Sequence, residues 1–125
     1  MPRLFTVQQA NEALIEIRPL VERILEIRTE LLERRPDLEP VLEKLGHNGG
    51  SRAISEATEA FGQLEKLIHQ IQEMGAEIKD INTGLLDFRT LREGREVYLC
   101  WQYGEEEVGY WHDLDAGFAG RQPLE

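Results

Sequence analysis

The side chains that could carry out chemistry gather in the last third of the chain. A carboxylate, a thiol and an imidazole follow one another as Asp87, Cys100 and His112. These residue types form the nucleophile-and-base set of many enzymes, and they are also ligands for divalent transition metals. The set therefore has two open interpretations: thiol chemistry centred on Cys100, or a metal or small-ligand site.

No short motif decides between these interpretations. The chain contains no Cys-x-x-Cys, no His-Glu-x-x-His, no Gly-x-Ser-x-Gly, no phosphate-binding loop and no dinucleotide fingerprint. A reactive cysteine would also need a cationic neighbour that lowers its pKa, and the sequence offers His112, Arg89 and Arg121. The sequence names no reaction, and it leaves open whether the protein is an enzyme.

Apolar and polar residues alternate along the segments that would hold these side chains. Residues 85–90, 95–102 and 108–113 each read as a strand, and Glu93 and Gly94 form a tight turn between the first two. We expect an antiparallel three-stranded β-meander over residues 85–113, followed by an irregular tail over residues 114–125.

The tight turn sets the register of the first two strands by pairing Arg92 with Arg95. Asp87 then lies opposite Cys100, and a second loop that pairs Gln102 with Val108 adds two pairs, Cys100 with Tyr110 and Tyr98 with His112. Since side chains alternate between faces, one face is apolar and should be core. Its expected members are Leu86, Phe88, Val97, Leu99, Trp101 and Trp111. The polar face should carry Asp87, Arg89, Tyr98, Cys100, Gln102, Tyr110 and His112.

The polar face is the candidate site, and a loop carboxylate and a tail guanidinium can reach it. The candidate residues are Asp87, Tyr98, Cys100, Glu105, His112 and Arg121. Cys100, His112 and Asp87 are the candidate metal ligands, for a divalent transition metal. The alternative is a polar network that lies beneath a partner's surface.

The tail has its own two interpretations. Gly117, Phe118, Gly120 and Arg121 could cradle an anion with backbone donors and a guanidinium. Alternatively, the tail folds back, Phe118 fills a gap in the core, and Arg121 pairs with a carboxylate.

The preceding residues predict a long antiparallel helical hairpin over residues 6–82. Thr6 and Gln9 form a capping-box pattern, and apolar residues then recur three and four positions apart up to Pro36. A second helix should begin at Ser51 and run to about Ile81, with stripes that face the first in a coiled-coil-like way. We expect the sheet to lie across one end of this hairpin, because a three-stranded meander must cover its apolar face. Two residues should be its buried anchors: Trp101 and Trp111.

The connection between the two helices should contain a short helical piece and a turn. Leu38 to Leu45 is apolar-periodic, and the glycine-rich residues 46–50 form the most flexible stretch. His47 in that stretch is expected to be a solvated side chain rather than a ligand. Gly75 occupies one position of the second stripe, which suggests close approach of another backbone.

Length and composition limit the class of protein. The 125 residues predict one α+β domain, and a net charge of −10 disfavours binding to nucleic acid. A local basic patch around Arg89, Arg92, Arg95 and Arg121 is the exception to consider. One cysteine excludes an intramolecular disulfide, and no apolar run is long enough for a signal peptide or a membrane span. A cytoplasmic protein is expected.

A long, ordered series of short motifs runs through the second half of the chain. The series is Glu77-Ile78-Lys79-Asp80, Gly84-Leu85-Leu86-Asp87-Phe88, Gly94-Arg95-Glu96-Val97-Tyr98-Leu99-Cys100-Trp101, Gly104-Glu105, Trp111-His112 and Gly117-Phe118-Ala119-Gly120-Arg121. It resembles the bacterial and archaeal family called domain of unknown function 2203. The opening segments Leu4-Phe5-Thr6, Ala10-Asn11 and Arg18-Pro19-Leu20-Val21 also fit, so the resemblance covers nearly the whole chain.

This resemblance implies positions rather than an activity, since the family has no established activity, substrate or cofactor. The positions that the family pattern keeps include Asp80, Asp87, Cys100, Trp101, Glu105, Trp111, His112 and Arg121. Several of them lie on the polar face, as a shared site would require. Arg89 departs from the pattern, in which proline is commoner, so it is not expected to take part in a shared function.

Three hypotheses of function follow. The leading one is a non-enzymatic interaction or binding module of the cytoplasm that pairs with a second copy or a partner helix. The second is a metal- or small-ligand-binding protein with its site on the polar face. The third is a thiol-dependent enzyme centred on Cys100.

Overall fold

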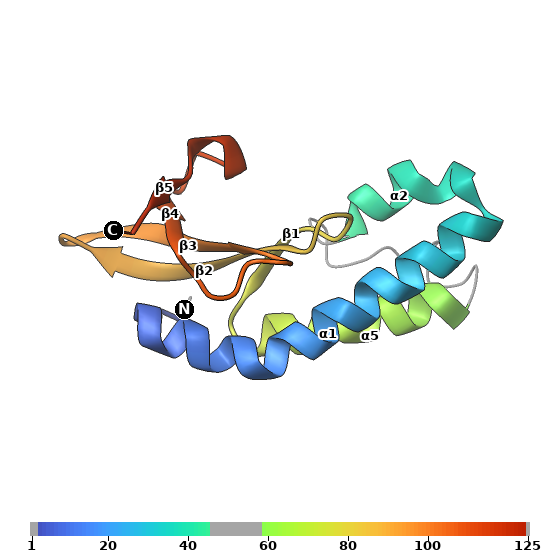
Figure 1. Ribbon diagram of the computed structural model, residues 1–125, viewed down its shortest axis with the longest axis horizontal. Coiled ribbons are helices and arrows are strands. Elements are labelled where there is room, and N and C mark those ends of the chain that lie inside the picture. The colour runs from blue at the N-terminus through green and yellow to red at the C-terminus, as the bar shows by residue number, and fades with distance from the viewer. Residues whose placement is uncertain (1–2, 46–58, 125) are drawn as a thin grey trace.

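The computed structural model describes residues 3–45 and 59–124 and shows an α+β fold (Figure 1). The helical elements are α1 (Val7–Arg34), the 3-10 turn η1 (Pro36–Leu38), α2 (Glu39–Glu43), α5 (Glu59–Glu73) and the 3-10 turn η2 (Phe118–Gly120). The strands are β1 (Glu77–Asp80), β2 (Leu85–Arg92), β3 (Arg95–Gln102), β4 (Tyr110–His112) and β5 (Gln122–Pro123). The predicted α+β class is confirmed.

Helix α1 begins and ends where the sequence predicts. Thr6 accepts a hydrogen bond from the amide of Gln9, and the Gln9 side chain accepts one from the amide of Thr6, which is the predicted capping box. The helix passes through Pro19 and stops at Arg34, before Pro36. Its apolar stripe is buried and consists of Ala10, Leu14, Ile17, Val21, Ile24, Ile27 and Leu31.

The prediction that the second helix runs to Ile81 is wrong. Helix α5 ends at Glu73, and Gly75 then adopts a φ of +99°, in the left-handed region that favours glycine. A Cβ atom at Gly75 would lie 2.8 Å from Cζ of Phe5, so the glycine makes room for an aromatic side chain rather than for the predicted second backbone. Because the helix ends before these residues, Glu77–Asp80 is extended and pairs with β2 as strand β1. The predicted helix start at Ser51 and the turn that contains His47 lie outside the described residues.

Among the described residues, the sheet has five antiparallel strands in the order β1-β2-β3-β4-β5, so the predicted three-stranded meander is its centre. Strand β1 adds one edge, and β5 adds the other from within the tail, which the sequence predicts to be irregular. The predicted third strand is shorter than expected, and Gln102 does not pair with Val108. The reason is that the amide of Val108 donates to Oδ1 of Asn11 on α1, at 2.7 Å, instead of joining the sheet.

The predicted register of the central strands is confirmed. Glu93 and Gly94 have φ values of +52° and +84°, as a tight hairpin turn with two left-handed residues requires. The facing pairs are Arg92 with Arg95, Asp87 with Cys100, Phe88 with Leu99, Arg89 with Tyr98, Cys100 with Tyr110 and Tyr98 with His112.

The apolar face of the sheet packs on the first half of α1, and α5 lies along the second half of that helix (Figure 1). The amide of Phe5 donates to the carbonyl oxygen of Arg89 at 2.7 Å, and the Phe5 and Phe88 rings meet edge to face. Trp101 is fully buried, as predicted, and its Nε1 donates to the carbonyl oxygen of Glu105. Trp111 is only partly buried, which corrects the prediction of a second buried anchor.

Candidate metal centre

Three neighbouring strands each contribute one side chain to a single cluster. Asp87 comes from β2, Cys100 from β3 and His112 from β4. Asp87 and Cys100 are a facing pair, and His112 lies one pair further along β3, opposite Tyr98. A carboxylate oxygen, the thiol sulfur and an imidazole nitrogen all lie within 4.8 Å of one another. The structure thus brings together the three residues that the sequence predicts as metal ligands.

The cluster is buried, a property that the strand pattern of the sequence leaves open. The exposed fractions are 2 % for Asp87, 0 % for Cys100 and 2 % for His112. Strand alternation says only which face a residue occupies, not what lies over that face, and a fully buried histidine is uncommon. Burial removes water from three polar groups, so each must find partners within the protein.

The two ring nitrogens of His112 have different environments. Nδ1 lies 2.8 Å from the carbonyl oxygen of Asp113, and because a carbonyl only accepts, Nδ1 carries a proton and donates it. Nε2 lies 3.1 Å from Oδ1 of Asp87 and 3.1 Å from Oδ2. A neutral imidazole with its proton on Nδ1 would therefore direct a bare lone pair at two carboxylate oxygens.

Asp87 also has a cationic neighbour that the sequence does not reveal. Nζ of Lys79 lies 3.9 Å from Oδ2 of Asp87 and 3.3 Å from Oε1 of Glu77. The sequence does not predict Lys79 as a neighbour of Asp87, because the helical apolar pattern places residues 77–80 in the second helix rather than in a strand. Burial raises the pKa of the Asp87 carboxyl, and the His112 imidazole and the Lys79 ammonium oppose that rise.

Cys100 is a poor nucleophile in the absence of a metal. Burial, followed by the nearby Asp87 carboxylate, raises the pKa of the Cys100 thiol to about 12. Arg121 opposes the rise but does not overcome it. A catalytic thiolate needs the opposite shift, so the environment of Cys100 disfavours the thiol-dependent enzyme.

Arg121 and Glu105 form a bidentate ion pair beside the cluster. Their nitrogen-to-oxygen distances are 3.1 and 2.8 Å, and Glu105 also accepts a hydrogen bond from the amide of Gln102 at 2.7 Å. Nη1 of Arg121 lies 3.9 Å from Sγ of Cys100. Glu105 therefore belongs with Arg121, and it is not one of the three clustered donors.

Tyr98 lies beside the cluster without joining it. Its ring centroid is 5.5 Å from that of His112, but its hydroxyl donates to Oε1 of Glu77 at 2.9 Å. Arg89 pairs with Glu77 and with Glu96 on the same surface.

The arginines named as a possible basic patch are largely paired with carboxylates. Arg89 pairs with two glutamates, Arg95 pairs with Asp113, and Arg121 pairs with Glu105. Arg92 lies over the ring of Trp111, at 4.7 Å from its centroid. This arrangement gives no support to a basic patch for nucleic acid.

The dimensions of the cluster suit a transition metal ion. Ligand bonds of about 2.0–2.3 Å at tetrahedral angles place the donor atoms about 3.3–3.8 Å apart. The observed spacing runs from 3.1 Å, between Nε2 and the carboxylate oxygens, to at most 4.8 Å. The oxygen, sulfur and nitrogen donors therefore lie within the range of separations from which one ion could be bound.

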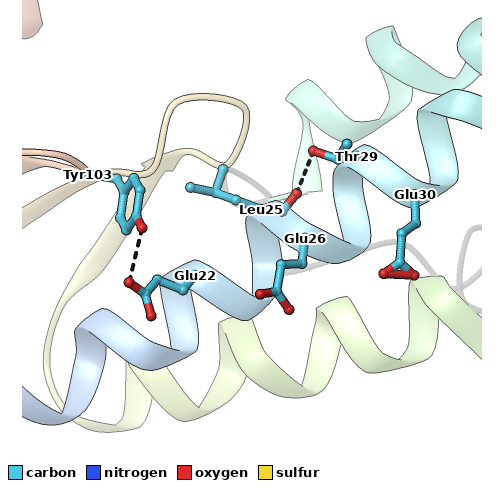
Figure 2. Close-up of a pocket in the computed structure, with 6 residues that line it drawn as sticks. All are labelled: Glu22, Leu25, Glu26, Thr29, Glu30 and Tyr103. Atoms are coloured by element: carbon cyan, nitrogen blue, oxygen red, sulfur yellow. Dashed lines mark hydrogen bonds between the residues drawn. The ribbon is translucent and has the colours of Figure 1, made fainter.

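The groove in Figure 2 is separate from this cluster. It has a volume of about 570 Å³ and lies between α1 and the loop that follows β3. Tyr103 donates to Glu22 across it at 3.0 Å, and the hydroxyl of Thr29 donates to the carbonyl oxygen of Leu25 (Figure 2). None of the six candidate residues lines this groove.

Comparison with known proteins identifies one family. The family model described as "Uncharacterized conserved protein (DUF2203)" matches residues 3–124, so the chain belongs to that family, as its motifs suggest. No curated protein and no solved structure matches the chain. Across the described residues, we find no helix with the length and apolar character that crossing a membrane requires.

Proposed function

We propose that this member of the domain of unknown function 2203 family binds a divalent transition metal ion through Asp87, Cys100 and His112. The observation that carries the proposal is the position of His112 Nε2, which faces both oxygens of Asp87 at 3.1 Å while Nδ1 donates to a backbone carbonyl. Two hydrogen-bond acceptors at this distance repel each other. A proton on one of the two groups, or a cation bound by both, must therefore lie between them.

Three arrangements supply that positive centre. His112 can carry a second proton, Asp87 can carry one, or a metal ion can bind both groups. Cys100 favours the third arrangement, because its sulfur lies in the same cluster and supplies a third metal ligand, whereas without a metal its thiol serves only as a hydrogen-bond partner of Asp87. Imidazole, thiolate and carboxylate together suit Zn²⁺ and related ions, so zinc is the expected ion.

A bound ion would connect β2, β3 and β4 through one ligand from each strand. With three protein ligands, a tetrahedral ion has one further position, which water or a small ligand would take. Metal binding requires Cys100 in its reduced form, and a single cysteine fits the reducing cytoplasm in which we place the protein.

The self-association that the helical stripes predict stays a second proposal. Within the described residues the stripes of α1 and α5 are buried inside the chain, so they are not free to pair with another copy. Exposed apolar side chains on other surfaces, such as Ile15 and Leu91, are what supports it. Light scattering at high concentration tests this proposal, and a monomer would count against it.

Elemental analysis and a cobalt titration test metal binding. We expect protein prepared without added metal to contain close to one zinc per chain, and the metal-free protein to take up Co²⁺ with a thiolate-to-cobalt absorption band. Cys100→Ser should remove that band, and Asp87→Asn and His112→Gln should weaken binding strongly. His69→Gln is the matched control, since His69 is exposed on α5 and pairs with Glu73.

Zinc should also raise the melting temperature of the metal-free wild type, because a ligand that binds only the folded state stabilises it. This measurement needs no variant to fold. If the folded wild type holds no metal and neither Zn²⁺ nor Co²⁺ changes its melting temperature, the cluster is a buried His112–Asp87 ion pair and the proposal is wrong.

A further inference from the structure

The environment of the Cys100 sulfur contains one feature that the three clustered donors do not explain. Arg121 comes from the tail, and its Nη1 approaches Sγ at 3.9 Å, within hydrogen-bonding distance for sulfur. The same Nη1 donates to Oε1 of Glu105 at 3.1 Å, and Nη2 donates to Oε2 at 2.8 Å. The guanidinium is therefore aimed between a carboxylate and the sulfur.

Several contacts fix the guanidinium in this place. Its central carbon lies 3.8 Å from the ring centroid of Tyr110 and 4.3 Å from that of Phe118. Glu105, which holds the other side, is itself held by the amide of Gln102 at the end of β3. Arg121 is thus oriented by β3, β4 and the tail together, and few orientations of its side chain remain.

A metal-bound thiolate is the species that such a donor would stabilise. An N–H group directed at a ligand sulfur withdraws electron density from it and orients it, and partners of this kind tune both the affinity and the electronic properties of metal sites. If Arg121 only anchored the tail, its ion pair with Glu105 would be enough. Its guanidinium would then have no reason to lie close to Sγ of Cys100.

We propose that Arg121 is a positioning residue for the metal site, which donates an N–H group to the Cys100 ligand, and that Glu105 holds Arg121 in place. This inference rests on the proposed metal-binding function. It assigns to the tail segment around Arg121 a role other than the anion cradle or the core plug that its sequence suggests.

The test compares two variants of the pair with two matched controls. Arg121→Met removes the donor and keeps an apolar stem against Tyr110 and Phe118, whereas Glu105→Gln keeps the size of the carboxylate and weakens its hold on Arg121. The controls are Arg35→Met and Asp37→Asn, because Arg35 and Asp37 form another bidentate pair, at 3.0 and 2.9 Å, which is exposed and remote from the sheet.

Two readouts are taken on each folded protein. Competition with a chelator should show zinc affinity falling about 10–100-fold in Arg121→Met and less in Glu105→Gln, the range seen when partners of metal ligands are removed. The thiolate-to-cobalt band should shift to lower energy in Arg121→Met, because a sulfur that loses a hydrogen bond gives up electrons more easily. Arg121→Lys, which restores an N–H donor, should return the band toward its wild-type position.

The outcomes separate the two proposals. If the wild type binds no metal, the proposed function fails and this inference fails with it. If the wild type shows the thiolate band, and Arg121→Met keeps both the affinity and the band energy of the Arg35→Met control, only the role of Arg121 is overturned. Should Arg121→Met not fold, the Glu105→Gln protein decides: a zinc affinity and a band energy equal to those of the Asp37→Asn control would overturn the inference.

Discussion

Asp87 and Cys100 face each other across β2 and β3 and are both buried, on the opposite side of the sheet from the Phe88–Leu99 pair that packs on α1. The sheet therefore has two interiors, one apolar and one polar. Variants of residues in the polar interior test the proposed chemistry. Variants of residues in the apolar interior test which side chains stabilise the fold.

Alkylation of Cys100 should be slow in the metal-free protein. Because its pKa of about 12 is far above that of free cysteine, the thiolate fraction at neutral pH is about 10³ lower, and burial slows the reaction further. The rate should keep rising with pH above about 9, where that of free cysteine has levelled off. Timed reaction with iodoacetamide, followed by mass spectrometry, measures it, and a rate equal to that of free cysteine would contradict the burial of Cys100.

His112→Ala should destabilise the metal-free protein. It leaves the Asp87 carboxylate and the Asp113 carbonyl without their imidazole partner, and a buried polar group without a partner costs about 1–3 kcal/mol. Urea unfolding followed by circular dichroism gives the free energy of unfolding. His69→Ala, on the exposed surface of α5, is the control, and equal stability of the two variants would mean that the cluster is open to water.

The two tryptophans should differ in their importance for stability. Trp101→Ala removes a fully buried side chain and should cost about 3–5 kcal/mol. Trp111→Ala should cost clearly less, since Trp111 is partly buried and Arg92 and Arg95 lie over its ring. Thermal unfolding of both variants measures the difference. A larger loss for Trp111→Ala would show that it is the main anchor of the sheet.

Two glycines, one inside α5 and one just after its end, should respond to alanine in opposite directions. A methyl group added at Gly62 would meet no atom of a neighbouring element within 4 Å among the described residues, so Gly62→Ala should stabilise the helix by about 0.5–1 kcal/mol. Gly75→Ala should destabilise, because Gly75 has a φ of +99° and a Cβ there would meet Phe5 at 2.8 Å. Chemical unfolding of the pair checks this, and stabilisation by Gly75→Ala would show that α5 can continue past Glu73.

The sequence predicts the centre of the sheet better than its edges, for reasons that particular residues show. The Glu93–Gly94 turn allows one register of β2 with β3, which places Asp87 opposite Cys100, and the register of β4 with β3 then brings His112 beside them. Strand β1 is missed because Ile78 fits both the helical stripe of α5 and the inward position of a short strand. The spacing of apolar residues alone cannot distinguish a longer helix from a short strand here. Gly75 is the residue in the sequence that signals the end of the helix.

The sequence predicts the membership of the candidate site but not its environment. Alternation places a residue on a face, whereas the burial of His112 and the approach of Lys79 depend on which other segments join that face. Strand β5 is equally hard to predict, since it is two residues long and one of them is Pro123.

The contacts of α1 have a consequence for how the protein is made. The first half of this helix contacts the loop between β3 and β4: Asn11 accepts a hydrogen bond from the amide of Val108, and Arg18 donates to the carbonyl oxygen of Glu106 at 2.5 Å. During synthesis, that half leaves the ribosome before β2 and β3, whose apolar face packs on it in the folded protein. Ala10, Leu14 and Ile17, which are buried in the folded protein, are therefore exposed on the nascent chain until those strands have been made.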